Sequence, residues 1–321
     1  MAMNRVVVTG ANGFVGRALS RALIARGHAV TGLVRKAGGC VDGVREWLYD
    51  GGDFAGIADA QWPDADCVVH LAACVHVMND AASDVDSAFR ATNVDGTLRV
   101  AEAARRRGVR RFVFVSSIKA IAESDGGRPL VEDDHAHPED AYGRSKLEAE
   151  SALREFAVTS GLDVVIVRPP LVYGPHVRAN FLGMMDVIWK GVPLPLGAIA
   201  ARRSLVYVDN LADVLVRCAT DPRAAQGCFH VADDDAPTVT ELLRMVGDAL
   251  DKRARLFPVP AGALKVLGRL TGRSAAVDRL TTSLQVDSTH VTRVLNWHPP
   301  FTTRQGLAAT AAWYRSRDTQ K

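Results

Sequence analysis

Short apolar runs rich in β-branched residues alternate with longer amphipathic segments through the first half of the chain. This alternation is typical of βα units that wind around a parallel sheet. Gly27, Gly108 and Gly161 stand where helices of this length would end in a left-handed residue. The pattern predicts an α/β fold with a doubly wound parallel sheet. We expect strands at 5–9, 29–34, 67–72, 112–116 and 163–167, and helices at 14–26, 84–107 and 142–160.

The composition is that of an ordinary globular protein: 321 residues, 48% hydrophobic and 23% charged, with a net charge of +3. So small a net charge gives no global indication of nucleic acid or of an anionic membrane as a partner. The densest basic run, Arg105 to Arg111, falls where a helix is predicted to end at Gly108. Cations at that position complement the helix dipole, so we interpret the run as a solvated helix end rather than a phosphate patch.

The five cysteines show no metal-type spacing and mostly lie inside apolar segments, which predicts reduced thiols and no metal site. The first ten residues lack the apolar core of a signal peptide, and no stretch approaches the ~20 apolar residues of a membrane span. We therefore expect a cytoplasmic protein without a membrane span.

Three glycines, Gly10, Gly13 and Gly16, occupy the connection between the first predicted strand and the first predicted helix. A turn this tight needs residues without a Cβ atom, and the start of the helix offers unpaired N–H groups to a phosphate. In this strand-to-helix setting the motif predicts a dinucleotide-binding site rather than a structural turn.

Tyr142 and Lys146 are four residues apart on a predicted helix and therefore project from one face. A nearby ammonium favours the phenolate, so we expect Lys146 to lower the pKa of Tyr142 and to prepare it for proton transfer. Ser117 ends a predicted strand at the edge where sites form in such sheets, and its hydroxyl can bond the same substrate oxygen. Ser116 is the rival for this role, but Ser117 is the last serine before the loop.

The end of the second predicted strand bears on the choice of nicotinamide cofactor. An NAD-specific site usually places an acid there for the ribose 2′-hydroxyl, whereas a 2′-phosphate needs cations. This chain has Val34 at that position, followed by Arg35 and Lys36. The pattern favours NADP(H), with NAD(H) as the alternative, although a cation pair at a strand end is also common on solvated surfaces.

Several motifs together resemble the extended short-chain dehydrogenase/reductase family, also called the NAD-dependent epimerase/dehydratase family, in its nucleotide-sugar-modifying branch. The resemblance covers essentially the whole chain. It rests on TGANGFVG (9–16), VVHLAA (68–73), Asn93 in TNVDGT, FVFVSS (112–117), YGRSK (142–146) and RPPLVYGP (168–175).

The resemblance implies catalytic roles for Ser117, Tyr142 and Lys146, with Lys146 also on the nicotinamide ribose. It implies a Rossmann domain over 1–168 plus about 204–232, and a smaller, discontinuous substrate domain over 169–203 plus about 233–321. The residues expected at the cofactor are Gly10, Asn12, Gly13, Phe14, Val15, Gly16, Arg35, Lys36, Leu71, Ala72, Ala73, Tyr142, Lys146 and Pro169.

The resemblance also suggests contacts to a nucleotide-diphospho-sugar. Asn180 is similar to an asparagine that contacts the diphosphate, although it could instead cap a helix. Arg203 is similar to a phosphate-contacting arginine, and a solvated loop charge is the alternative. Arg279 is a weaker candidate because its spacing departs from the epimerase pattern. His76 and Asn79 follow a predicted strand and either face the sugar or belong to a polar loop.

Within this branch the sequence favours reduction of a nucleotide-diphospho-4-keto-hexose, in the biosynthesis of a surface polysaccharide, over two other chemistries. The family's dehydratases carry an Asp-Glu pair after the catalytic Ser or Thr, whereas this chain has Ile118 and Lys119. A C4 epimerase with tightly bound NAD is the alternative, and retention of Tyr142 and Lys146 argues against a cofactor-sensing regulator. By resemblance, we expect a homodimer formed through the helices at about 84–107 and 142–160.

Overall fold

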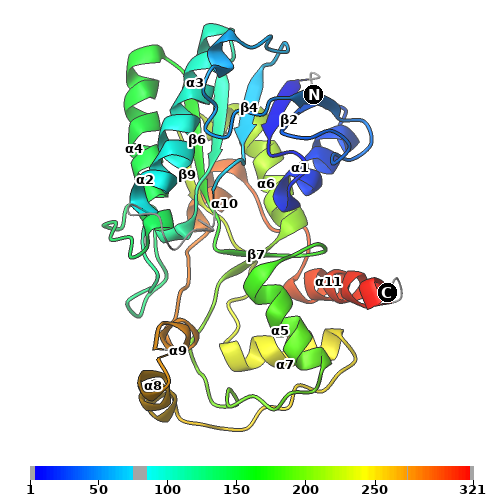
Figure 1. Cartoon of the computed structure of the whole chain (residues 1–321), viewed down its shortest axis with the longest axis vertical. Coiled ribbons are helices and arrows are strands. Elements are labelled where there is room, and N and C mark those ends of the chain that lie inside the picture. The colour runs from blue at the N-terminus through cyan, green and yellow to red at the C-terminus, as the bar shows by residue number, and fades with distance from the viewer. Residues whose placement is uncertain (1–3, 75–84, 273, 319–321) are drawn as a thin grey trace.

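The computed structural model describes residues 4–74, 85–272 and 274–318. Within these ranges the chain forms a larger lobe around a parallel sheet and a smaller lobe beside the carboxyl edge of that sheet (Figure 1). The sheet has the strand order β3-β2-β1-β4-β5-β6-β9, and every pairing in it is parallel. Its strands are β1 (Arg5–Thr9), β2 (Ala29–Val34), β3 (Arg45–Leu48), β4 (Cys67–His70), β5 (Arg111–Val115), β6 (Asp163–Arg168) and β9 (Cys228–His230).

Alternate residues of the central strands enter two different hydrophobic cores, one on each face of the sheet. Val6 and Val8 of β1 pack in the core that contains α1 and α6, whereas Val7 packs in the core that contains α3 and α4. A sheet buried on both faces explains why its strands are almost continuously apolar. The predicted doubly wound α/β fold is confirmed. These four helices are α1 (Phe14–Ala25), α3 (Gly96–Arg106), α4 (Ala141–Ser160) and α6 (Val208–Thr220).

The structure differs from the sequence-based prediction at three places. The helix expected at 84–107 is divided into α2 (Val85–Arg90) and α3 by a π-helical turn, Ala91–Asp95. The strand expected at 67–72 ends at His70, because the next two N–H groups bond to a side chain instead of a strand. The short edge strand β3 was not predicted, since its sequence, REWL, carries little apolar signal.

The smaller lobe contains a two-stranded parallel sheet and several helices. A capping box begins one of these helices: Thr238 accepts a hydrogen bond from the Glu241 N–H at 3.1 Å, and the Glu241 side chain accepts one from the Thr238 N–H at 2.8 Å. The other strands and α-helices after β6 are β7 (Leu171–Tyr173), α5 (Ala179–Trp189), β8 (Leu205–Tyr207), α7 (Val239–Ala249), α8 (Ala261–Leu270), α9 (Ser274–Thr281), α10 (Thr289–Leu295) and α11 (Thr303–Asp318).

The chain passes repeatedly between the two lobes. From β8 it enters α6, which packs against α1, and β9 then joins the main sheet beside β6. Later, α10 packs against β9, and the Trp297 indole donates a hydrogen bond to Asp213 of α6 at 2.9 Å. The segment 289–297 therefore lies against the larger lobe, and the exact domain boundaries stay a prediction.

The described residues offer few other features that could direct the function. None of the five cysteines forms a disulfide with another described residue. The described ranges hold no group of His, Cys, Asp and Glu side chains arranged to bind a metal ion. Among the same residues, no helix is both long and apolar enough to traverse a bilayer.

Candidate active site at the carboxyl edge of the sheet

The glycine turn after β1 brings the backbone of the turn and the start of α1 into close contact. Gly10 adopts a left-handed φ of 68°, and its N–H donates to Leu33 O at 3.1 Å. A Cβ atom at Gly16 would lie 2.2 Å from Gly10 O, so only glycine allows this packing. No side chain caps α1 at Gly13, which leaves the first N–H groups of the helix available to an anion.

The glycine turn and the start of α1 form one wall of a cradle for an anion, and the segment that leaves β4 forms the opposite wall. The Leu71 and Ala72 N–H groups both donate to Thr9 Oγ1, at 3.0 and 3.1 Å. A Cβ atom at Gly10 would lie 3.3 Å from Ala72 N, so these two backbone segments are in close contact. Because β1 and β4 are adjacent at the point where the strand order reverses, the cradle occupies the ligand position of doubly wound folds.

A buried histidine supports this wall, and sequence reasoning missed it. The Thr9 hydroxyl already accepts two N–H groups, so its proton is donated to Nδ1 of His70, 3.0 Å away. Nε2 of His70 then carries the ring proton and donates to Thr97 Oγ1 at 3.2 Å, while Thr97 donates to Asn93 O. Complete burial and the nearby Lys146 charge lower the pKa of His70 to about 3. The sequence signal was a lone polar residue in VVHLAA.

Asn93 joins three parts of the site from inside the π-helical turn. Its amide donates to Cys74 O and to Ser145 Oγ, both at 3.0 Å, and its carbonyl accepts the Cys74 N–H at 2.8 Å. The Ser145 hydroxyl in turn donates to Tyr142 O at 2.8 Å. The π-turn thus connects the chain after β4 to α4, and such turns often occur at functional sites.

Tyr142 and Lys146 lie in the first two turns of α4 and face the end of β5. Asp140 caps the helix by accepting the Gly143 N–H at 2.7 Å. The Lys146 ammonium donates to Val115 O at 3.0 Å and lies 5.8 Å from the centre of the Tyr142 ring. The structure therefore brings these two predicted residues together on one helix face.

The electrostatics of this pair differ from the sequence-based expectation. Burial, assisted by the charge of Asp140, raises the pKa of Tyr142 to about 12. Burial also lowers the pKa of Lys146 to about 8, against the opposing effect of Glu150. In the protein alone the pKa of the phenol is therefore raised, not lowered as expected, because burial and the Asp140 carboxylate both disfavour the phenolate.

Ser117 begins the short 3-10 turn that follows β5, and its hydroxyl accepts the Lys119 N–H at 3.2 Å. Its side chain is partly exposed, whereas Ser116 is buried and its hydroxyl has no hydrogen-bond partner in the described ranges. Of the two rivals, Ser117 is therefore the one that a substrate can reach. Pro169 supports the turn from β6, because its carbonyl accepts the Ile118 N–H at 3.0 Å.

Lys119 links the Ser117 turn to the helix of Tyr142, and sequence reasoning gave it no such role. Its ammonium lies 2.6 Å from Asp140 Oδ2 and 2.9 Å from Glu123 Oε1. Burial lowers the pKa of Lys119, but the hydrogen bonds to these two carboxylates outweigh that effect and raise it. A Cβ atom at Gly143 would lie 2.4 Å from Lys119 O, so the glycine of YGRSK permits the turn and the helix to pack.

The end of β2 matches the sequence description. Val34 is buried, and Arg35 and Lys36 are exposed in the loop that follows. The carboxylate of Glu46 on β3 accepts the N–H groups of Gly38 and Cys40 in this loop. The Glu46 carboxylate is therefore hydrogen-bonded to the backbone of the loop.

The predicted substrate contacts lie in different surroundings. Arg203 is partly buried; burial lowers its pKa, and the charges of Asp125 and Glu123 raise it. Glu123 also binds Lys119, so Arg203 and Lys119 share a neighbouring carboxylate. Asn180 is exposed as the second residue of α5; the N-cap is Arg178, so the capping alternative for Asn180 was wrong.

Two further groups of candidates are not joined to these residues by any described contact. Arg279 is exposed on α9, and its guanidinium donates to Ala275 O of the same helix at 3.1 Å. His76 and Asn79 lie outside the described residues.

Residues 6–232 match the model of the NAD dependent epimerase/dehydratase family. The chain belongs to this family. It is 41% identical over 311 residues, 95% of this chain and 94% of the relative, to a UDP-glucose 4-epimerase of Vibrio cholerae. The recognition of the extended short-chain dehydrogenase/reductase family, in its nucleotide-sugar-modifying branch, is thereby confirmed.

Solved structures of the family share the fold over nearly the full chain. The UDP-glucose 4-epimerase of Thermotoga maritima, in complex with UDP-glucose, superposes with a TM-score of 0.76 at 23% identity, covering 98% of this chain and 99% of the other. The UDP-glucose 4-epimerase of Thermus thermophilus, in complex with NAD, gives 0.75 at 24%, covering 97% and 99%. The glycine turn and the Ser117 edge are therefore parts of an enzyme fold of the epimerase/dehydratase family.

Proposed function

We propose that the protein is a C4 epimerase of a nucleotide-diphospho-sugar and that it uses a retained NAD. The observation that supports the proposal is the shared helix face of Tyr142 and Lys146, with the Lys146 ammonium bonded to the end of β5 two residues before Ser117, in a chain 41% identical to a UDP-glucose 4-epimerase. The reductase hypothesis from the sequence has less support, because it rests on the end of β2 alone.

The residues around the glycine turn suit a dinucleotide. The free start of α1 and the close approach of Gly10 to Ala72 accommodate a pyrophosphate. When bound, NAD supplies a place for the hydride of the sugar C4 to be accepted and returned. By family resemblance, Lys146 also holds the nicotinamide ribose.

Tyr142 exchanges the proton of the sugar 4-hydroxyl, and Ser117 donates a hydrogen bond to the same oxygen. With a pKa of about 12 in the protein alone, Tyr142 is a neutral acid at pH 7, which suits protonation of the returning alkoxide. In the opposite direction the phenolate needs a neighbouring positive charge, and the Lys146 ammonium lies 5.8 Å from the ring centre.

Arg203 and Asn180 are our candidates for the diphosphate of the substrate. Arg203 has no ion-pair partner in the described ranges, and a guanidinium can donate two parallel hydrogen bonds to a phosphate. Asn180 stands in the first turn of α5, whose N-terminus has no side-chain cap. Arg203→Met is expected to raise KM for the nucleotide sugar about tenfold or more with a smaller change in kcat.

The decisive experiment is to denature the purified protein and identify any dinucleotide that is released. Stoichiometric NAD, together with interconversion of UDP-glucose and UDP-galactose without added cofactor, is the expected result. An empty protein that binds NADPH much more tightly than NADH, and that consumes it with a 4-keto sugar, would overturn the epimerase in favour of the reductase. The exposure of Arg35 and Lys36 after β2 is the observation that supports the reductase as the second candidate.

The homodimer also stays a prediction. The outward sides of α2 and α4 are joined by the ion pairs Arg90–Glu148, at 3.0 Å, and Arg144–Asp86, at 2.7 Å. A bundle formed through these helices would cover a charged surface rather than an apolar one. Light scattering during size exclusion measures the oligomeric state directly.

A further inference from the structure

Helix α8 of the smaller lobe presents an apolar face to solvent. Val266, Leu267 and Leu270 expose 56%, 55% and 80% of their surface, and Ala263 is exposed beside them. These positions follow the i, i+3, i+4, i+7 spacing of one helix face. The helix is buried along a different stripe, through Leu264 and Gly268. Such a face normally lies against another apolar surface.

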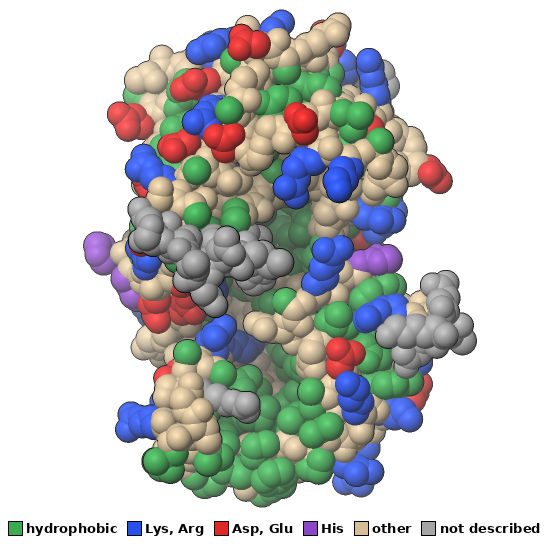
Figure 2. Space-filling view, viewed as in Figure 1, with side chains coloured by type: hydrophobic (Ala, Val, Ile, Leu, Met, Phe, Trp, Pro, Cys, Tyr) green, Lys and Arg blue, Asp and Glu red, His purple; other side chains and the backbone are tan. Residues whose placement is uncertain are grey.

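The same end of the molecule carries further exposed apolar side chains. Phe257 and Val192 are 46% and 44% exposed. The segments that carry them are joined by a hydrogen bond from the Gly197 N–H to Phe257 O. The chain then runs directly through Pro260 into α8. Figure 2 shows hydrophobic side chains gathered at this lower end, where Figure 1 places α8 and the chain between α7 and α8.

The charge around this surface is predominantly positive. From Lys252 to Val277 the sequence holds no Asp or Glu, although acidic and basic residues nearly balance over the whole chain, 36 to 39. Lys265 and Arg269 form a separate stripe on α8, one turn apart. The cations among the described residues of this segment are Lys252, Arg253, Arg255, Lys265 and Arg269.

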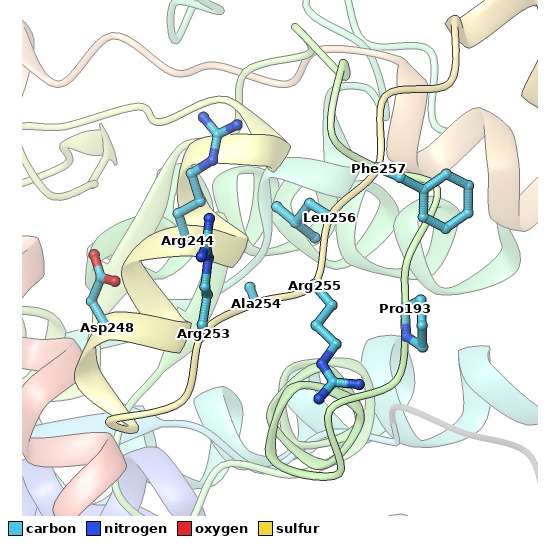
Figure 3. A pocket seen from close by; sticks show the side chains of 8 residues that line it. All are labelled: Pro193, Arg244, Asp248, Arg253, Ala254, Arg255, Leu256 and Phe257. Atoms are coloured by element: carbon cyan, nitrogen blue, oxygen red, sulfur yellow. The ribbon is translucent and has the colours of Figure 1, made fainter.

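A groove next to Phe257 concentrates part of this charge. It encloses about 740 Å³ between α7 and the chain that follows it. Arg244, Arg253 and Arg255 line it, against the single carboxylate of Asp248. Figure 3 shows the side chains of Arg244, Arg253 and Arg255 among those that line it. Among the described residues none of the three guanidiniums has a salt bridge, so the groove is open to phosphate groups.

We propose that this end of the smaller lobe, with α8 at its centre, binds peripherally to the surface of an anionic lipid membrane. Exposed Leu and Val side chains would enter the boundary between headgroups and acyl chains, and the surrounding Lys and Arg would contact lipid phosphates. A second copy of this chain is a poor occupant, because it would bring like charges together. Nucleic acid would leave the Leu267 and Leu270 side chains unmatched.

The test is sedimentation of the full chain with vesicles of phosphatidylcholine, with and without phosphatidylglycerol. The wild-type protein is expected to bind only the vesicles that contain phosphatidylglycerol, and less tightly at high salt. The double variant Leu267→Glu, Leu270→Glu should lose about tenfold or more of this binding. Both side chains are largely exposed, so unfolding temperature and turnover of a soluble nucleotide sugar should be unchanged.

Val158→Glu is the matched control, since Val158 is 87% exposed on α4 of the other lobe and should keep full binding. Failure of the wild-type protein to bind phosphatidylglycerol vesicles would overturn the proposal. So would equal binding by the double variant, or an equal loss in Val158→Glu. A double variant that keeps vesicle binding but changes the oligomeric state would instead identify the face as a contact between copies. None of these results depends on the reaction catalysed.

Discussion

The ammonium of Lys119 lies 2.6 Å from the carboxylate of Asp140. Lys119 follows Ser117 in the turn after β5, and Asp140 caps the helix that carries Tyr142. This ion pair therefore joins the turn that carries Ser117 to the helix that carries Tyr142. Glu123 accepts a second hydrogen bond from the same ammonium and so fixes its direction.

Lys119→Met is expected to lower kcat about ten- to hundredfold while leaving KM and retained cofactor nearly unchanged, because the Ser117 turn can then move relative to Tyr142. Steady-state kinetics with the nucleotide sugar measure the split between kcat and KM. Lys119→Arg should restore most of the rate, since it keeps the charge. Arg128→Met, which breaks the exposed pair with Asp134, is the control and should have no effect. An equal loss in this control would indicate general destabilisation.

Tyr142→Phe is expected to reduce turnover by about a thousandfold or more, because the phenol is the proposed proton-transfer group. The dinucleotide content should stay close to that of the wild type, since the glycine turn is untouched. The measurement pairs the turnover assay with quantification of released dinucleotide. Activity within about tenfold of wild type would remove Tyr142 from the mechanism.

Gly16→Ala should abolish dinucleotide binding and destabilise the fold, since the new Cβ atom would lie 2.2 Å from Gly10 O. Gly262→Ala is the matched control on α8, where a Cβ atom would meet nothing within 4 Å. That control should be neutral or stabilised by about 0.5–1 kcal/mol, as for other exposed helical glycines. Cofactor titration and urea unfolding of both variants test the pair. If Gly16→Ala bound the dinucleotide normally, the glycine turn would not be the phosphate site.

Burial of His70 makes the stability of the protein depend on pH. The pKa of His70 is lowered to about 3 in the folded protein, from an ordinary 6.5. Below pH 6.5 the unfolded chain therefore takes up a proton that the folded protein refuses, and stability falls as pH falls toward 3. Each pH unit in this window changes the free energy of unfolding by up to about 1.4 kcal/mol.

His70→Gln should remove much of this pH dependence between pH 6.5 and 4, because glutamine does not titrate. Urea unfolding of both proteins across the window is the measurement. Burial also lowers the pKa values of His230, His28 and His176, so these groups should contribute to the dependence that remains. An unchanged slope in the variant would assign the pH dependence to other groups.

The hydrophobic pattern was sufficient to locate most of the sheet. The strands at 5–9 and 29–34 were predicted with the bounds that the structure has, since buried parallel strands are short, apolar and β-branched. The glycine turn was equally visible, because its spacing follows from local geometry. Tyr142 and Lys146 could be paired because residues four apart on a helix share a face.

Only the tertiary structure decided how these residues are supported. The contacts of Asn93 with Cys74 and Ser145, and of Lys119 with Asp140, join segments far apart in sequence, and no local pattern predicts them. The direction of the Tyr142 pKa shift also depended on packing, since burial of the phenol is its largest cause.

The face of α8 shows the same division between sequence and structure. Its apolar residues fall on more than one side of the helix, and which of them are buried depends on the neighbouring elements. The structure buries Leu264 and leaves Leu267 and Leu270 exposed. Local spacing thus determined the elements and the chemical groups of this protein, whereas long-range packing determined their surroundings, because burial and charge are properties of the assembled fold.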